Sequence, residues 1–448
     1  MKQLRLTAFD MNCVGHIQQG LWTHPRDRSA GYTSLDHWVG LAQLLERGLF
    51  DGLFLADILG VYDVFGAAPD AAIRHAVQVP VNDPLLLVPA MAHATTHLGF
   101  GVTANLSYEP PYLFARRMST LDHLSRGRIG WNVVTGYLDS AARAMGLAQQ
   151  VAHDDRYDVA DDYMQAVYKL WEGSWADDAV RADRATGQYA DPTRVRAVHH
   201  RGPYFQLDGI HLSEPSPQRT PLLYQAGSSA RGRRFAGQHA ECVFLNGGPR
   251  PAVAAHVAAI RAEAVRAGRA ASDIQAHVGI SVVVAETEAL AQAKLADYRR
   301  HASPEAALVH ASASMGIDLA AYGMDDPIEA VPTQAIASNL AAMAQQGMTK
   351  RKLLDRMVLG SRQVPITGTA SQVADTLLAW SSEADVDGFI LSRTVTPACF
   401  EDFIELVVPE LQRRGAYKTE YAPGTLRRKL FGADRLPDTH PAAGVRFG

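Results

Sequence analysis

The feature that most constrains this chain is an alternation of eight strand-like segments with helical ones along its 448 residues. Most of the strand-like segments are continuous runs of apolar or β-branched residues, which is the pattern of parallel strands buried on both faces. The eight segments are Leu4–Met11, Phe50–Asp57, Leu98–Leu106, Arg128–Thr135, Pro221–Ala226, Glu241–Leu245, His277–Ala285 and Asp387–Ser392. Eight strands separated by helices predict an α/β fold, a (β/α)8 TIM barrel, with its site at the C-terminal ends of the strands.

Two of the helical segments have clear signals. Ser34 is a candidate N-cap and Gly48 a candidate end for a helix whose apolar face consists of Leu35, Trp38, Val39, Ala42 and Leu45. A second helix has apolar residues at three- and four-residue steps, namely Tyr157, Ala160, Met164, Val167 and Trp171. Each of these faces is expected to cover the barrel.

Two connections are too long for plain strand-and-helix units, although barrels of this length commonly form one domain. Residues 172–220, after the fourth strand, are expected to form a small β excursion. Residues 287–386, after the seventh strand, contain an alanine-rich helix, a less regular region (Ser303–Gln334) and a further helix after Thr369. We expect one domain over residues 1–448, with these insertions as lids or oligomer contacts. The tail 415–448 is expected to wrap a partner subunit in a homodimer or homotetramer.

Composition and charge exclude several classes of function. A net charge of −4 and a pI of about 6.5 leave no basic surface that would attract nucleic acid or an anionic membrane. The three cysteines, Cys13, Cys242 and Cys399, are too few and too scattered for a disulfide framework or a zinc site, and no metal is predicted. No signal peptide or membrane-spanning run is visible, so a cytoplasmic protein is expected.

Residues 221–247 predict a phosphate-binding turn. An apolar strand breaks at Gly227-Ser228-Ser229, a basic helix start follows, and a second strand comes next. A helix N-terminus offers unpaired backbone N–H groups and the positive end of the helix dipole, and glycine and serine allow a phosphate to come close. An ordinary strand-to-helix turn with a serine N-cap is the alternative.

Polar side chains follow the first five strands, where a barrel places its functional residues. They are Cys13 and His16, Asp57 and Tyr62, Thr103 and Asn105, Asn132 and Tyr137, and Ser228 with Ser229. Each also has a purely structural interpretation: Asp57 as a helix cap, Asn132 as a buried amide, Cys13 as small core filler. Their shared position at one rim favours a site.

Two further histidines are candidate site residues. His153 precedes the Tyr157 helix, so both side chains are expected to face a phosphate near its first turn. His310 lies in the irregular late insertion, where a lid would bring it over the barrel mouth.

Five long segments carry a resemblance to a known family. They are FDGLFLAD, MSTLDHLSRGRIGWNVVTG, HDDRYDVADDYMQAVYKLWEGSW, EPSPQRTPLLYQAGSSARGRRFA and DFIELVVPELQRRG. They resemble the bacterial-luciferase-like flavin monooxygenases, in the branch with nitrilotriacetate and dibenzothiophene-sulfone monooxygenases. The opening FDMNCVGHIQQGLW, with DILGVYDV and VQVPVNDPL, looks most like long-chain alkane monooxygenase.

This resemblance implies an FMN site at matching positions. Asp57, Thr103 and Asn132 would border the isoalloxazine ring, whereas His153, Tyr157, Ser228 and Ser229 would hold the ribityl chain and phosphate. Residues implied near the reacting centre are Cys13, His16, Tyr62 and His310. Tyr137 stands where the alkane enzyme carries a histidine, and tyrosine is not cationic at neutral pH. The substrate pocket or the protons available in it would therefore differ.

The resemblance further implies a two-component monooxygenase. A separate NAD(P)H:flavin reductase would deliver FMNH2, and O2 would add to its C4a atom as a hydroperoxide that oxygenates an alkane, sulfone or related sulfur or nitrogen compound. The protein would hold the flavin and exclude water. Two alternatives stay open from the sequence, a deazaflavin-dependent oxidoreductase and a flavin-binding barrel without turnover.

Overall fold

Eight parallel strands close into a barrel in the computed structural model, which describes residues 2–329, 333, 335, 340, 343–361 and 363–447. The strands are β1 (Arg5–Met11), β2 (Gly52–Ala56), β3 (Gly99–Asn105), β4 (Ile129–Val134), β9 (Leu222–Gln225), β10 (Cys242–Asn246), β11 (Gln275–Ile280) and β14 (Gly388–Ser392). Each pairs with its neighbours in this sequence, and β14 closes the ring against β1. All eight predicted strands and the TIM-barrel fold are therefore confirmed.

The seventh predicted strand corresponds to two strands in the structure. The apolar run at His277–Ala285 divides at Ser281: β11 ends at Ile280 and stays in the barrel, whereas β12 (Val282–Val284) pairs with β13 (Ile366–Gly368). Ser281 Oγ donates to Gln363 Oε1 at 2.5 Å at the division. Hydrophobic periodicity did not mark the change because both strands are buried on both faces.

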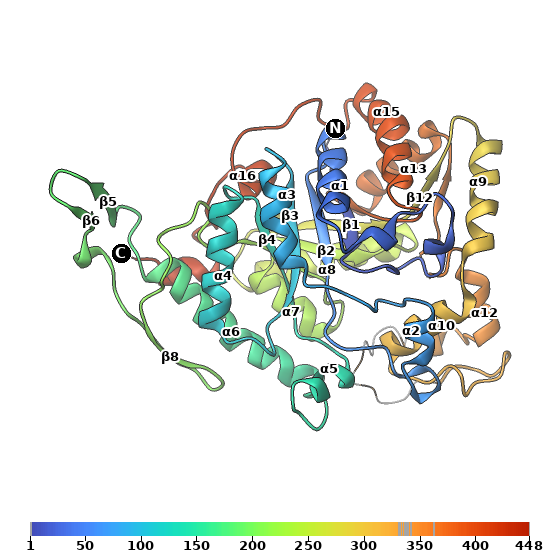
Figure 1. Ribbon diagram of the computed structural model, residues 1–448, viewed down its shortest axis with the longest axis horizontal. Coiled ribbons are helices and arrows are strands. Elements are labelled where there is room, and N and C mark those ends of the chain that lie inside the picture. The colour runs from blue at the N-terminus through green and yellow to red at the C-terminus, as the bar shows by residue number, and fades with distance from the viewer. Residues whose placement is uncertain are drawn as a thin grey trace.

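Helices surround the barrel and cover its outer face (Figure 1). They are α1 (Leu35–Arg47), α3 (Val88–His93), α4 (Pro111–Leu124), α6 (His153–Gly173), α7 (Ala230–His239), α8 (Arg250–Arg266), α13 (Ala370–Ala384), α14 (Ala398–Asp402) and α15 (Val408–Arg413). Two short helices, α2 (Asp70–Arg74) and α5 (Asp139–Ala144), lie in the loops after β2 and β4. Ser34 Oγ caps α1 by accepting from the N–H of Asp36, as expected. Leu35 is wrongly placed on the core face, because it is 55% exposed while Leu41 is buried instead. Hydrophobic periodicity predicts which face of a helix is buried. It does not predict at which residue of that face contact with the core begins.

The first insertion forms two antiparallel hairpins, which confirms the predicted β excursion. They pair β5 (Val180–Asp183) with β6 (Gln188–Ala190) and β7 (Val198–Arg201) with β8 (Gln206–Gly209). In Figure 1 they extend away from the barrel.

The second insertion is more helical than expected. It contains α9 (Glu288–His301), α10 (Pro304–Met315) and α12 (Lys350–Arg356). The segment Ser303–Gln334 was expected to be irregular, yet it begins with the regular helix α10, which Ser303 caps. Residues 330–332 and 334 of this segment lie outside the described part of the chain. Because α10 is buried on most sides, it lacks the amphipathic pattern that marks a surface helix.

The C-terminal tail packs on its own barrel, and its expected contact with a partner subunit stays a prediction. Its helix α16 (Leu426–Phe431) buries Arg427, whose Nε donates to Glu241 Oε1 at 2.6 Å. The guanidinium also donates to the carbonyl of Thr220 at 2.9 Å. A charge removed from water needs such partners, and they lie within this chain. No helix in the described part of the chain is long and apolar enough to cross a membrane.

Candidate active site

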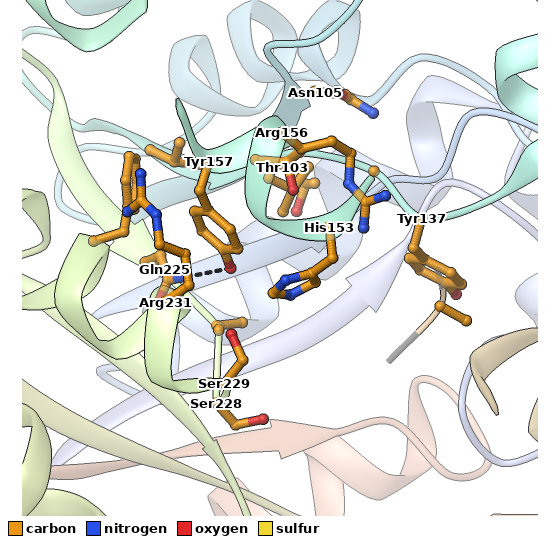
Figure 2. A pocket seen from close by; sticks show the side chains of 18 of the residues that line it. Thr103, Asn105, Tyr137, His153, Arg156, Tyr157, Gln225, Ser228, Ser229 and Arg231 are labelled. Carbon is orange, nitrogen blue, oxygen red and sulfur yellow. Dashed lines mark hydrogen bonds between the residues drawn. The ribbon is translucent and has the colours of Figure 1, made fainter. Parts of the chain in front are cut away.

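A cavity of about 460 Å³ lies at the C-terminal ends of β2, β3, β4 and β9. Figure 2 shows the polar side chains that line it, with Tyr157 and His153 of α6 opposite Ser228 and Ser229. Seven residues predicted from the sequence line this cavity: Asp57, Thr103, Tyr137, His153, Tyr157, Ser228 and Ser229. Asn105, which the sequence places beside Thr103 at the end of the third strand, lines it as well, and so does Arg231 from the basic start of the helix after the fifth strand. Arg156 and Gln225 also line it but were missed, since nothing in their local sequence distinguishes them from ordinary polar residues.

The loop after β9 has the geometry of an anion-binding turn. Ser229 is the N-cap of α7, and its Oγ accepts from the N–H of Gly232 at 2.9 Å. A Cβ atom at Gly227 would lie 2.6 Å from Tyr157 Oη and 2.3 Å from Gln225 Nε2, so a side chain there would displace the ends of both side chains. The ordinary capped turn and the phosphate cradle are thus compatible, because one loop provides both the cap and open backbone N–H groups.

Charged side chains beside this turn form ion pairs and a contact with an aromatic ring. Arg231 donates to Asp158 at 2.9 Å and to Asp161 at 2.5 Å, and its guanidinium lies 5.4 Å from the centre of the Tyr157 ring. Gln225 Nε2 in turn donates to Tyr157 Oη at 3.5 Å. These contacts hold the Tyr157 ring in one position between α6 and α7.

Two buried oxygens with unused acceptor capacity lie at the inner side of the cavity, one on its wall and one behind it. Asn132 Nδ2 donates to Thr103 Oγ1 at 2.9 Å, so Asn132 lies directly behind the cavity wall and not on it. Asn132 Oδ1 and Gln225 Oε1 have no hydrogen-bond partner among the described residues, although the two side chains are buried. A buried acceptor without a donor costs free energy, which a bound molecule with N–H or O–H groups would recover.

Asp57, at the end of β2, has a strongly perturbed carboxyl group. Burial raises its pKa to about 7, a backbone hydrogen bond from Ile58 opposes the rise, and the negative charge of Asp83 adds to it. This carboxyl group therefore exchanges protons near neutral pH.

Tyr62 and His310 come together with Tyr137, which lines the cavity. Tyr62 Oη donates to Gln78 Oε1 at 2.5 Å and lies 3.0 Å from Tyr137 Oη. Because an amide oxygen only accepts, Tyr137 is the donor to Tyr62. The rings of Tyr62 and His310 have their centres 5.7 Å apart. Gln78 was missed: it follows no strand, and it adopts a positive φ of 53° that nothing in the sequence signals.

The expected position of His310 needs correction. It was placed on an irregular lid, but it lies in the regular helix α10 and is half-buried. Its approach to Tyr62 agrees with the prediction that both lie near the barrel mouth.

Cys13 and His16 lie deeper, after β1, and neither lines the 460 Å³ cavity. Burial raises the pKa of the Cys13 thiol to about 12, so it stays protonated, and its Sγ donates to the carbonyl of Gly15 at 3.2 Å. Burial lowers the pKa of His16 well below its ordinary value, so its imidazole is neutral. Arg393 supports this loop, since it pairs with Asp10 at 3.0 Å and donates to the Cys13 carbonyl at 3.1 Å.

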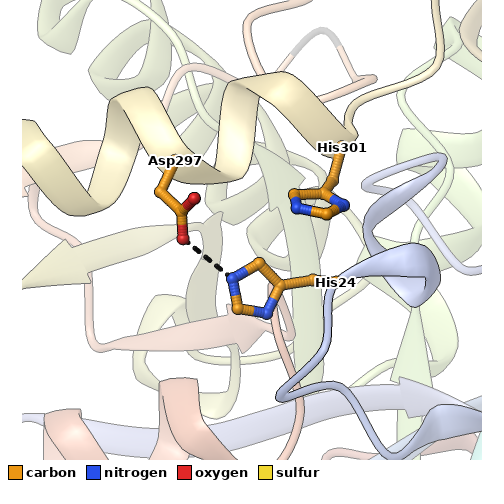
Figure 3. Close-up of side chains that lie close together, drawn as sticks. All are labelled: His24, Asp297 and His301. Carbon is orange, nitrogen blue, oxygen red and sulfur yellow. Dashed lines mark hydrogen bonds and ion pairs between the residues drawn. The ribbon is translucent and has the colours of Figure 1, made fainter.

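A second cluster, His24, Asp297 and His301, has atoms close enough to hold a metal ion (Figure 3). Its hydrogen bonds favour a different role. The N–H of Arg26 donates to His24 Nδ1 at 3.1 Å, so a neutral His24 carries its proton on Nε2, which lies 2.9 Å from Asp297 Oδ2. A metal at Nε2 would force two N–H groups against each other, and we assign the cluster to packing between α9 and the N-terminal loop.

Comparison with known proteins decides the family. Residues 12–387 match the luciferase-like monooxygenases. The chain belongs to this family. The sequence-based identification is therefore confirmed, as is the enzyme class, a flavin-dependent monooxygenase.

Individual relatives of the monooxygenase align over nearly its whole length. It is 48% identical to the long-chain alkane monooxygenase of Geobacillus thermodenitrificans over 99% of this chain and 98% of that protein. It is 44% identical to the dimethyl-sulfide monooxygenase of Hyphomicrobium sulfonivorans over 99% and 94%. A crystal structure of riboflavin lyase with modified FMN and riboflavin superposes with a TM-score of 0.95 at 42% identity, covering 100% of both chains.

Proposed function

We propose that this protein is the oxygenase component of an FMN-dependent two-component monooxygenase. It would receive reduced FMN from a separate NAD(P)H:flavin reductase and transfer one oxygen atom of O2 to a small organic substrate. Reduced FMN, when bound, supplies the two electrons with which O2 yields one oxygen atom in the product and one in water. The observation that carries this proposal is the cradle of Gly227, Ser228 and Ser229 on the wall of the 460 Å³ cavity.

The residues present fit FMN. A phosphate would lie at the N-terminus of α7, where Ser228, Ser229 and the backbone N–H groups would hold it together with His153 and Tyr157. The close approach at Gly227 leaves space there that a side chain would remove. The ring and ribityl chain carry N–H and O–H donors, which suit the unpartnered oxygen of Gln225 on the cavity wall.

The other end of the cavity would bind substrate and manage protons. Tyr137 donates its hydroxyl hydrogen to Tyr62 and lines the cavity. The imidazole of His310, with its ring centre 5.7 Å from that of Tyr62, would contribute a group that both donates and accepts hydrogen bonds. Cys13, protonated and buried, and neutral His16 would close the base of this region against water.

The relatives support a neutral, largely apolar substrate. Two of them are named for alkanes and dimethyl sulfide, neither of which carries a charge. The cavity has apolar lining of the same character from Ile58, Leu59 and Leu138. We therefore place the substrate among alkanes, thioethers and related small molecules.

Oxygen labelling tests the proposal. The purified chain is mixed with FMN, NADH, an unrelated flavin reductase, isotopically labelled O2 and either dimethyl sulfide or a long-chain alkane. We expect one labelled oxygen atom in the product and the other in water. Unlabelled products only, or equal turnover without reductase, would contradict the two-component assignment.

A further inference from the structure

A second cavity, of about 260 Å³, adjoins the first. The two cavities share five lining residues: Asp57, Ile58, Leu59, Thr103 and Asn105. The outer rim of the second cavity contains exposed residues, among them Asn82, Asp83, Arg117 and Met145. It therefore leads from the protein surface to the same wall that faces the candidate flavin site.

The second cavity has three carboxyl groups among apolar side chains in its lining. Asp83 and Glu109 line it together with Asp57, and Arg117 is paired with Glu109 at 2.9 Å. Burial raises the pKa of Glu109, Arg117 lowers it, and Asp83 raises it further. Carboxyl groups around a cavity open to solvent favour water over an apolar substrate.

We propose that the second cavity is the proton inlet of the active site, and that the Asp57 carboxyl group carries protons from its water into the main cavity. This inference rests on the proposed function, because the main cavity must hold the reaction that uses the protons. In each transfer the Asp57 O–H bond breaks toward an acceptor in the main cavity. The carboxylate then takes a proton from water in the second cavity, which releases hydroxide to solvent.

Asp57 suits this task by position and by charge. It lies on the wall common to both cavities, and its half-buried side chain exchanges protons near neutral pH. The charged or titratable groups that face it are Asp83 from the loop before β3, Glu109 and Arg117 from the loop and helix after β3, and the Cys13 thiol after β1. From α6 and α7, His153, Arg156 and Arg231 lie on the main cavity.

The first test follows Asp57 in the protein without flavin. Carboxyl carbons of aspartate are isotopically labelled, and the Asp57 resonance is identified by its loss in Asp57→Asn. We expect midpoint titration near pH 7 in the native chain. Asp83→Asn should move the midpoint to lower pH, because it removes a negative charge that raises the pKa. An ordinary acidic midpoint for Asp57 would overturn the proposal whether or not the enzyme binds FMN.

The second test follows coupled oxygenation of the flavin-loaded enzyme as a function of pH. Asp57→Asn should lose the pH dependence centred near 7 and slow by about tenfold or more, with partial rescue by imidazole added to the buffer. Flavin affinity is measured alongside, so that weak binding is not mistaken for lost proton transfer. An unchanged pH profile would overturn the role of Asp57.

A third test closes the inlet without touching Asp57. Met145→Trp places a large ring at the outer rim, whereas Leu147→Trp adds the same ring to the same loop outside the lining. Met145→Trp should slow oxygenation several-fold and Leu147→Trp should not, while the Asp57 titration persists in both. Equal rates for the two variants would show that protons arrive by another route. If neither they nor the native chain oxygenates any substrate, the proposed function fails instead.

Discussion

Replacing Ser229 with aspartate should lower the affinity for flavin without lowering the stability of the folded apoprotein. Ser229 caps α7 through its Oγ, and aspartate is as good an N-cap as serine. The helix dipole also favours a negative charge at this end. The apoprotein should therefore keep its melting temperature, within about 2 °C for a change of a few tenths of a kcal/mol.

The same change should repel the FMN phosphate. Two negative unit charges about 5 Å apart interact by about 3 kcal/mol at an effective dielectric constant of about 20. Ser229 is half-buried, so we discount this to about 1.5–3 kcal/mol, which corresponds to roughly a ten- to hundredfold loss of affinity. Ser229→Ala is a less selective variant, because it also removes the helix cap and costs about 1 kcal/mol of stability.

Quenching of flavin fluorescence measures the affinity of each variant for FMN and for riboflavin, which lacks the phosphate. We expect Ser229→Asp to weaken FMN binding strongly and riboflavin binding little. An equal loss for both ligands would mean that Ser229 lies near the ring or ribityl chain. Unchanged FMN affinity would refute the phosphate cradle.

Four further predictions follow from the structure. His310→Ala should bind FMN normally yet release hydrogen peroxide in place of product, as a peroxide assay would show; full coupling would make His310 a packing residue. Since the folded-state pKa of Asp57 is raised from 3.8 to about 7, its carboxyl group contributes stability at low pH that is lost as the pH rises from about 4 to 7. At pH 8 Asp57→Asn should thus stabilise the apoprotein by about 2 kcal/mol, half of the roughly 4 that three pKa units allow, and calorimetry would detect it. Arg427→Met should destabilise the chain by about 3–5 kcal/mol in denaturant titration by leaving Glu241 buried and unpaired, and adding Glu241→Gln should restore much of this. The purified chain with FMN should consume NADH slowly unless a reductase is added, and brisk consumption alone would contradict that expectation.

Several parts of the site could be read from local sequence. The turn at Gly227–Ser229 was recognisable because an apolar strand, small residues and a helix start follow one another directly. Asp57 and Thr103 were recognisable because they stand where buried strands end. In each case the signal lies within about ten residues, and the barrel then brings the strand ends to one rim.

Other residues could not be found in this way. Gln78 reaches Tyr62 from a segment without regular structure, and Arg231 reaches Asp158 and Asp161 from a different helix. Such contacts join residues far apart in the chain, and no local pattern encodes them. The same reason explains why His310 was assigned to a lid: α10 is buried on most sides, so its sequence lacks helical amphipathicity.

The sequence alone determined the eight strands, their order and the end of the barrel that carries the site, because burial on both faces and strand-to-helix turns leave local patterns. Three other features became visible only in the folded chain: β12 leaves the barrel, the tail packs on its own chain, and Asp57 lies between two cavities. These features depend on which distant surfaces meet. Packing and desolvation of the whole chain determine which surfaces meet, so no single segment of the sequence predicts it.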